Sequence, residues 1–307
     1  MITVIMPVYN EGPYIFENVS RVHELLNEAT VAHDFLLVDD GSKDQSWAEM
    51  CRLREELGCV TALQLSRNFG KEAALCAALE AADADAVVVM DSDLQHPPEY
   101  IPEMVRLWQE EGYDVVEGVK ADRGRESLRS KLVAHLFYRT FAETTGLDIG
   151  QASDFKLMNR AALEAWRKLP EHNTFFRGLS AWVGFKRYAM PFEVAPRAGG
   201  QTKWSFKSLM RLALNSLTAY TSVPLHLILW MGVLMGAAAV VLTVQTLVHY
   251  FMGRAAQGFS TVILLLLWIG SGIMISLSII GLYIARIYDE VKGRPRYLIR
   301  ERREARK

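Results

Sequence analysis

The chain has 307 residues, enough for one sizeable α/β domain and a smaller second part. Its formal net charge of −1 and its lack of a recognition motif argue against nucleic acid as a partner. The three cysteines form no CxxC pair, which is typical of reduced thiols in a cytosolic domain and not of a metal site. The N-terminus has no basic start followed by an apolar stretch, so we expect no signal peptide.

Charged residues are absent from two long stretches near the C-terminus. None occurs between Arg211 and Arg254, and none between Arg254 and Arg286. Each stretch exceeds the ~20 residues that a helix needs to cross a bilayer. The sequence therefore predicts two membrane-spanning helices, over residues 223–251 and 259–285, joined by a tight external hairpin.

Basic residues flank the two predicted spans. Lys203, Lys207 and Arg211 precede them, and the residues from Arg286 onward include nine Lys/Arg and four Asp/Glu. Such segments stay on the cytoplasmic side and attract anionic lipid headgroups, so we expect both termini in the cytoplasm. The Gly232/Gly236 pair has the small-xxx-small spacing of packed membrane helices, which suggests a homo-oligomer.

The residues before the first span have the pattern of an amphipathic helix. Apolar residues lie on one side of it, with Lys207 and Arg211 off that side. This is typical of a helix in the membrane interface, and a packing helix of the soluble domain is the alternative. The predicted parts are an N-terminal domain (1–204), an interfacial helix (205–221), a transmembrane hairpin (222–286) and a basic tail (287–307).

In the N-terminal domain, short apolar runs rich in β-branched residues alternate with helical patterns. The predicted strands are 3–7, 35–39, 60–65, 86–91 and 114–119, and the predicted helices are 13–28, 44–57, 71–82 and 98–111. This alternation favours an α/β domain with a mostly parallel sheet covered on both faces. In such sheets ligands bind at the carboxyl ends of the strands.

Acidic residues follow the fourth predicted strand. Asp91 comes directly after the apolar run, and Asp93 and Gln95 follow it. A second carboxylate two residues after the first indicates a shared cation, and oxygen ligands suit Mg²⁺ or Mn²⁺ bound with a substrate phosphate. A DxD sequence alone is a weak signal. His96 stands before Pro97-Pro98 and is interpreted as a turn residue, not as a metal ligand.

The other three strand ends carry related chemistry, which strengthens that signal. Asp39 and Asp40 end the second strand, and an acid there can accept hydrogen bonds from a ribose hydroxyl or a base. The first strand leads into Tyr9 and Glu11. The third leads to Lys71 at a helix N-terminus, a natural place for phosphate. Together these ends predict a site for a nucleoside diphosphate.

The whole pattern resembles the inverting family 2 glycosyltransferases of GT-A fold, and among them the polyprenyl-phosphate glycosyltransferases related to dolichol-phosphate mannose synthase. The matching segments are 4–11, 37–42, 68–72, 90–99, 153–157, 177–178 and 198–203. The resemblance covers nearly the whole chain. It departs at Lys120, where the family has Arg, and at Gln201-Thr202-Lys203.

The resemblance implies a role for each matching residue. The residues implied to hold the nucleotide-sugar donor are Pro7, Tyr9, Glu11, Asp39, Asp40, Lys71 and Asp91. Asp93 and Gln95 are implied as metal ligands, and Asp91, Asp93 and Asp154 as the catalytic acids. The basic residues implied to receive the lipid phosphate are Arg123, Arg129, Lys131, Arg197 and Lys203.

The implied reaction transfers a sugar from a nucleotide to polyprenyl (undecaprenyl) phosphate at the bacterial inner membrane. A phosphate monoester is largely ionised at neutral pH, because its second pKa is about 6, so this nucleophile needs no strong base. Asp154 therefore positions the donor or a cation, or alternatively acts as the base. Five Lys/Arg between Lys120 and Lys131 form a net positive loop suited to the acceptor.

Uridine and glucose are the expected donor base and sugar, with GDP-mannose or a modified pentose as alternatives. An NAD-dependent oxidoreductase would need a Gly-rich turn after the first strand, which residues 9–14 do not supply. A processive polysaccharide synthase would carry a Gln-x-x-Arg-Trp motif, which is absent here. A non-enzymatic membrane scaffold is disfavoured by the intact acids at the strand ends.

Overall fold

The computed structural model describes residues 1–120, 152–169, 171, 176–193, 223–252 and 259–306. The chain divides into two compact units. The first comprises Met1–Ser205 together with Arg294–Lys307, and the second comprises Phe206–Gly293. The predicted interfacial helix (205–221) lies outside the described residues.

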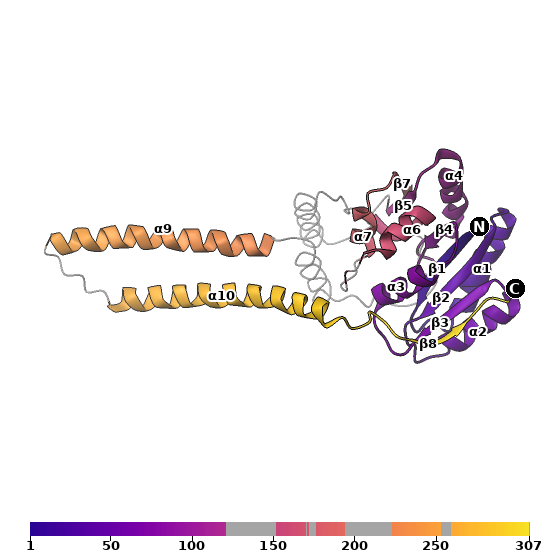
Figure 1. Cartoon of the computed structure of the whole chain (residues 1–307), viewed down its shortest axis with the longest axis horizontal. Coiled ribbons are helices and arrows are strands. Elements are labelled where there is room, and N and C mark those ends of the chain that lie inside the picture. The colour runs from indigo at the N-terminus through magenta and orange to yellow at the C-terminus, as the bar shows by residue number, and fades with distance from the viewer. Residues whose placement is uncertain (121–151, 170, 172–175, 194–222, 253–258, 307) are drawn as a thin grey trace. The chain divides into compact units, whose positions relative to one another are not determined.

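The first unit is built on an eight-stranded sheet of order β7-β5-β6-β4-β1-β2-β3-β8 (Figure 1). Its strands are β1 (Ile2–Val8), β2 (His33–Asp39), β3 (Val60–Leu65), β4 (Ala86–Val89), β5 (Val115–Lys120), β6 (Ala152–Asn159), β7 (Arg187–Phe192) and β8 (Ile299–Arg303). The neighbours β4, β1, β2 and β3 are mutually parallel, so their carboxyl ends share one edge, as predicted. β6 runs antiparallel between β4 and β5, and β8 runs antiparallel to β3.

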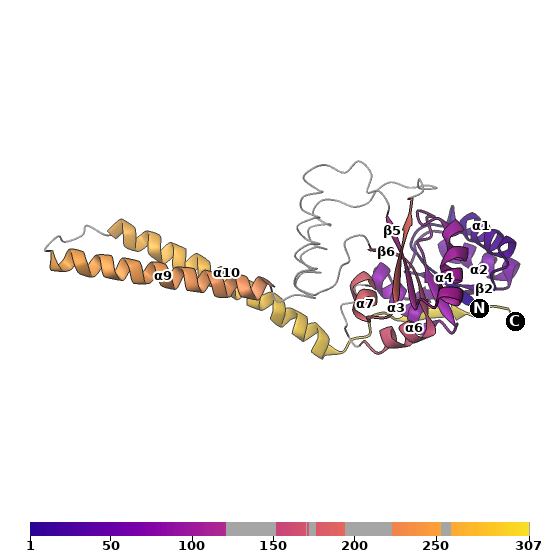
Figure 2. The ribbon, with the colours of Figure 1, turned by 90° about the horizontal axis from the view of Figure 1, so that it is seen from above.

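Helices cover both faces of this sheet (Figure 2). They are α1 (Ile15–Glu28), α2 (Ser46–Leu57), α3 (Lys71–Ala81), the short 3-10 helix η1 (Pro98–Tyr100), α4 (Ile101–Glu111), α6 (Arg160–Arg167) and α7 (Phe176–Trp182). α1, α2 and α4 lie on one face, and α3, α6 and α7 on the other. Alternate residues of β1, such as Val4 and Met6, share one buried cluster with Val19 and Val22 of α1, because side chains alternate across a strand.

All five strands and all four helices predicted in the N-terminal domain are present. The sequence does not predict β6, β7 or β8. It predicts a basic tail over residues 287–307, whereas in the structure residues up to Lys292 continue the last helix and Ile299–Arg303 form β8. β8 was hidden because four of its five side chains are charged, so it shows no apolar alternation.

The second unit contains two long helices, α9 (Val223–Phe251) and α10 (Phe259–Lys292). They pack closely at Gly272, where an added Cβ atom would lie 2.9 Å from the sulfur of Met235. The segments Ile228–His249 and Trp268–Lys292 are long and apolar enough to cross a membrane. Their length and composition agree with the two predicted spans and are compatible with membrane association.

Candidate active site

A proline lies inside β1, at the point where its neighbour β4 turns away. Met90 donates its N–H to the carbonyl of Ile5 (3.1 Å), so Ile5 and, two residues later, Pro7 direct their peptide groups toward β4. The β1–β4 pairing ends at Val89, so no strand there needs the N–H that Pro7 lacks. The Pro7 carbonyl instead lies 3.1 Å from the Ser92 hydroxyl. The end of β1 is thereby joined to the loop of residues 91–96, which contains Asp91 and Asp93 and is called the DxD loop below.

Glu11 continues this connection between loops. The hydroxyl of Ser92 lies 2.6 Å from Oε2 of Glu11 as well as near Pro7, and its single proton can serve one of these acceptors at a time. The backbone N–H of Glu11 donates to the Ser46 hydroxyl at the start of α2 (2.8 Å). Tyr9 lies two residues earlier and is 39% exposed, so it is accessible at the same rim.

The two acids at the end of β2, Asp39 within the strand and Asp40 directly after it, bind different partners. Asp39 is fully buried, and its oxygens accept from the Ser42 N–H (2.9 Å) and the Gln64 side chain of β3 (3.0 Å). Asp40 accepts from the backbone N–H groups of Phe69 (2.7 Å) and Gly70 (2.8 Å). Burial raises the pKa of Asp40, and these two donors oppose that rise. Its carboxylate therefore supports the loop that leads into α3.

Gly41 lets the loops after β2 and β3 touch. Its φ of +66° is in the left-handed region, and an added Cβ would lie 2.4 Å from the backbone carbon of Arg67. Any side chain would therefore push the two loops apart. The second loop leads into Lys71, the first residue of α3, so this close approach helps to fix the position of the Lys71 backbone.

The DxD loop is held from inside by His96. The Asp91 N–H donates to Nδ1 of His96 (3.1 Å), and the buried imidazole stacks on Phe155 of β6, with 5.3 Å between the ring centres. Burial lowers the pKa of His96. The Gln95 N–H donates to Oδ1 of Asp93 (3.1 Å). Asp91, Asp93 and Gln95 remain partly exposed at this turn, whereas His96 is engaged within the protein.

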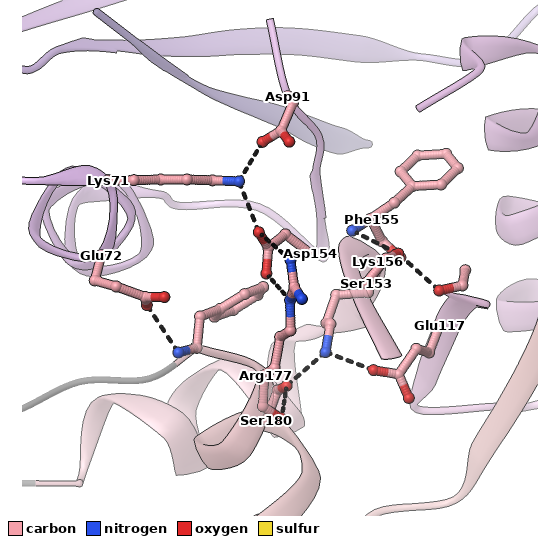
Figure 3. Close-up of polar contacts among 12 residues, drawn as sticks. Lys71, Glu72, Asp91, Glu117, Ser153, Asp154, Phe155, Lys156, Arg177 and Ser180 are labelled. Atoms are coloured by element: carbon pink, nitrogen blue, oxygen red, sulfur yellow. Dashed lines mark hydrogen bonds and ion pairs between the residues drawn. The ribbon is translucent and has the colours of Figure 1, made fainter. Parts of the chain in front are cut away.

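Four charged side chains meet beside the DxD loop (Figure 3). Lys71 Nζ lies 2.5 Å from Oδ1 of Asp91 and 2.6 Å from Oδ2 of Asp154. Arg177 of α7 donates to Oδ1 of Asp154 through Nε (2.7 Å) and to Oδ2 through Nη2 (3.1 Å). Burial alone would raise the pKa of Asp154, but Lys71 and Arg177 outweigh it and hold that pKa well below its usual range. Asp154 is thus an ionised carboxylate between two cations.

A second group of charges is centred on the buried Lys156 and Glu117. Lys156 is two residues after Asp154 on β6, and its Nζ lies 2.7 Å from Glu117 of β5 and 2.6 Å from the Ser180 hydroxyl of α7. Glu117 also pairs with Arg187 of β7. Burial lowers the pKa of Lys156, and Glu117 opposes that change. A buried charge without such partners would be strongly destabilising, so this group fixes β5, β6, β7 and α7 relative to one another.

Comparison with models of known protein families shows which family this chain belongs to. The family model described as glycosyl transferase family 2 matches residues 3–167. The chain belongs to glycosyl transferase family 2. It is therefore a glycosyltransferase, as the acids at the sheet edge led us to expect.

Relatives match this glycosyltransferase over nearly its whole length. An uncharacterized glycosyltransferase of Bacillus subtilis is 36% identical, over 97% of this chain and 93% of the relative. A bactoprenol glucosyl transferase of Shigella phage SfII is 32% identical, over 98% of this chain and 97% of its own. The crystal structure of glucosyl-3-phosphoglycerate synthase from Mycobacterium tuberculosis has a TM-score of 0.52 at 20% identity, covering 71% of this chain and 78% of the other. The N-terminal domain thus has the predicted GT-A fold.

The acids of the glycosyltransferase suit a metal that is shared with a substrate. Within the ranges that the structure describes, no group of three His, Cys, Asp or Glu side chains could hold a metal ion by itself. Asp91 and Asp93 lie partly exposed on one turn. Mg²⁺ and similar ions are commonly held by one or two carboxylates plus phosphate oxygens. The residues present therefore fit an ion that enters with a bound diphosphate.

The sheet edge brings together most of the residues named from the sequence. Glu11, Asp39, Lys71 and Asp91 come from the four parallel strand ends, and Asp154 joins them from β6. The basic residues predicted to receive the lipid phosphate lie outside the described residues: Arg123, Arg129, Lys131, Arg197 and Lys203.

The sequence assigns no role to four residues that support this site. Gln64 binds Asp39, Arg177 binds Asp154, and the buried Lys156 pairs with Glu117. The Arg177-Gly178 pair was visible as a motif of the resemblance. The Lys156–Glu117 pair had no local signal, because it joins strands 39 residues apart.

Proposed function

We propose that this glycosyltransferase transfers glucose, with inversion, from UDP-glucose to the phosphate of an undecaprenyl-type polyprenyl lipid at the cytoplasmic membrane face. The observation that carries the proposal is the convergence of Glu11, Asp39, Lys71 and Asp91 on one sheet edge beside Asp154. Relatives named bactoprenol glucosyl transferases, aligned over almost the entire chain, support both the sugar and the lipid acceptor.

On the donor side, Asp39 and Tyr9 would contact the nucleoside, with Pro7 and Glu11 shaping the rim. Gln64 and Ser42 keep Asp39 in one orientation. The related fold of glucosyl-3-phosphoglycerate synthase was crystallised with Mn²⁺ and UDP, which supports a uridine donor and a divalent cation. Asp93 and Gln95 would hold Mg²⁺ or Mn²⁺, which supplies positive charge to the leaving diphosphate when bound, and Asp91 would contact the donor.

On the acceptor side, the structure favours Asp154 as a positioning residue and not as the base. A base must take up a proton, and the paired cations Lys71 and Arg177 keep Asp154 ionised. The acceptor phosphate is itself an anion near neutral pH and can attack the anomeric carbon directly. In this reaction a phosphate oxygen forms the new glycosidic bond while the bond to the nucleoside diphosphate breaks, and the diphosphate leaves with the electron pair.

Membrane attachment follows from the same proposal. α9 and α10 would span the membrane as a hairpin, with the sheet domain and both termini in the cytoplasm, because basic residues flank the pair. The basic residues predicted within 120–131 and 197–203 would receive the lipid phosphate, and Gly232/Gly236 would permit packing between copies.

The test is a transfer assay with the full chain in detergent. Radiolabelled UDP-glucose and GDP-mannose are supplied separately with undecaprenyl phosphate and Mn²⁺, and labelled lipid is extracted. We expect label from UDP-glucose, reduced at least about 100-fold by Asp93→Asn. Asp83→Asn is the matched control, because Asp83 has an 89% exposed side chain on the surface. Transfer unaffected by Asp93→Asn would refute the metal assignment, and label from GDP-mannose alone would refute the donor.

A further inference from the structure

Glu72 connects the start of α3 to the start of α7, next to the cluster of charges. Its Oε2 accepts the backbone N–H of Phe176, the first residue of α7, at 2.8 Å (Figure 3). Lys71 precedes Glu72 and Arg177 follows Phe176, and both of these cations bind Asp154. Two adjacent links therefore join the same two helices, one through a backbone amide and one through the buried carboxylate.

The position of α7 depends on such links. The described part of α7 has seven residues, fewer than an isolated helix needs for stability, so its contacts with the rest of the domain help to hold it in place. Phe176 and Leu179 are buried, and Lys156 binds Ser180 in the second turn. At Phe176, where the described part of α7 begins, the backbone N–H donates to Glu72.

The position of Arg177 depends in turn on α7. Its guanidinium makes two hydrogen bonds to Asp154. Such paired bonds depend on geometry, and so on where the backbone of Arg177 lies. The amide that Glu72 holds belongs to the preceding residue, so loss of this contact would act on Arg177 first. Keeping Glu72 ionised here costs free energy. Burial, and to a lesser extent the negative charge of Asp154, raise the pKa of Glu72 to about 7.

We propose that Glu72 is a positioning residue that anchors α7 and so keeps Arg177 bound to Asp154 during sugar transfer. The proposal rests on the transfer reaction proposed above only for its kinetic consequence. The anchoring itself can be measured without substrate. Glutamine at position 72 keeps the shape and an oxygen acceptor for the Phe176 amide, whereas leucine keeps only the approximate size.

The experiment combines hydrogen exchange with a double-mutant cycle on the full chain in detergent. In Glu72→Leu, we expect the amides of residues 177–182 to exchange at least about tenfold faster than in the wild type, while Glu72→Gln stays within about threefold. Glu103→Leu is the control, since Glu103 is an exposed partner of Arg106 on α4. Unchanged exchange of α7 in Glu72→Leu would overturn the proposal.

Kinetics then separate positioning from general loss of structure. We expect Glu72→Leu to lower kcat/KM about 10- to 100-fold in the wild-type background. It should have little further effect in an Arg177→Ala background, because the loss of Glu72 acts by weakening the Arg177–Asp154 contact, which Arg177→Ala already removes. Losses that multiply would contradict the proposed route through Arg177. A wild-type chain without transferase activity would defeat the proposed function instead, and the exchange data alone would then decide the role of Glu72.

Discussion

At the scale of single residues, the site is organised by acids whose charges are compensated in different ways. Asp154 is compensated by Lys71 and Arg177, whereas Asp40 accepts two backbone N–H groups and supports a loop. Asp93 stays partly exposed at the turn after β4. Acids of the same type therefore differ in burial and in the groups that they contact, and Asp93 keeps part of its surface exposed at the sheet edge.

The pairing of Asp154 leads to a prediction about pH. Between pH 5 and 8, kcat/KM should rise and level off as the acceptor phosphate loses its second proton, with an apparent pKa of about 6. Asp154→Asn should lower kcat, because the amide leaves Lys71 and Arg177 without their shared anion. It should not move the acidic limb, because the pKa of Asp154 lies well below this range.

This profile is best measured in the Glu72→Gln background, which removes a carboxyl that titrates at about 7. Asp83→Asn serves as the control for an acid replaced on the surface. Loss or displacement of the acidic limb in Asp154→Asn would show instead that this residue is the base.

At the scale of elements, sequence reasoning succeeded where the signal was local. The strands β1 to β4 are apolar and short, each ends in turn or polar residues, and their parallel order follows from the intervening helices. The Asp39 and Asp91 sites could therefore be predicted together. β6 could not be predicted, because it carries charges such as Lys156 that only the packed domain compensates.

The C-terminal strand gives the prediction at this scale. β8 pairs with β3, aligning Glu301 with Gln64, and β3 would otherwise be the edge of the sheet. Deleting residues 299–307 should lower the Tm by roughly 5–10 °C and promote aggregation, because it exposes unpaired backbone groups along β3. Thermal unfolding followed by circular dichroism would measure this.

The control for that deletion keeps the backbone and removes charge. Arg300→Ala combined with Arg302→Ala leaves the strand pairing in place, and both side chains are exposed, so the Tm should change by less than about 2 °C. An unchanged Tm on deletion would mean that β8 contributes little. An equal fall in the control would assign the effect to charge and not to pairing.

At the scale of the whole molecule, composition alone separates a mixed-charge domain from two uncharged stretches, and the structure has a sheet domain and two long apolar helices in those places. Sequence could not predict that the chain returns to the sheet after α10. That return depends on tertiary contacts such as the bond from Arg296 to the carbonyl of Leu169, which joins residues 127 positions apart.

Calorimetric titration of UDP into the full chain asks whether the acids at the sheet edge bind a nucleoside diphosphate through a metal. With Mn²⁺ present, the wild type should bind UDP at least about tenfold more tightly than in EDTA, a difference of about 1.4 kcal/mol. Asp93→Asn should lose this difference, and Asp83→Asn should keep it. Equal affinity with Mn²⁺ and with EDTA in the wild type would show that these acids do not bind the diphosphate through a metal.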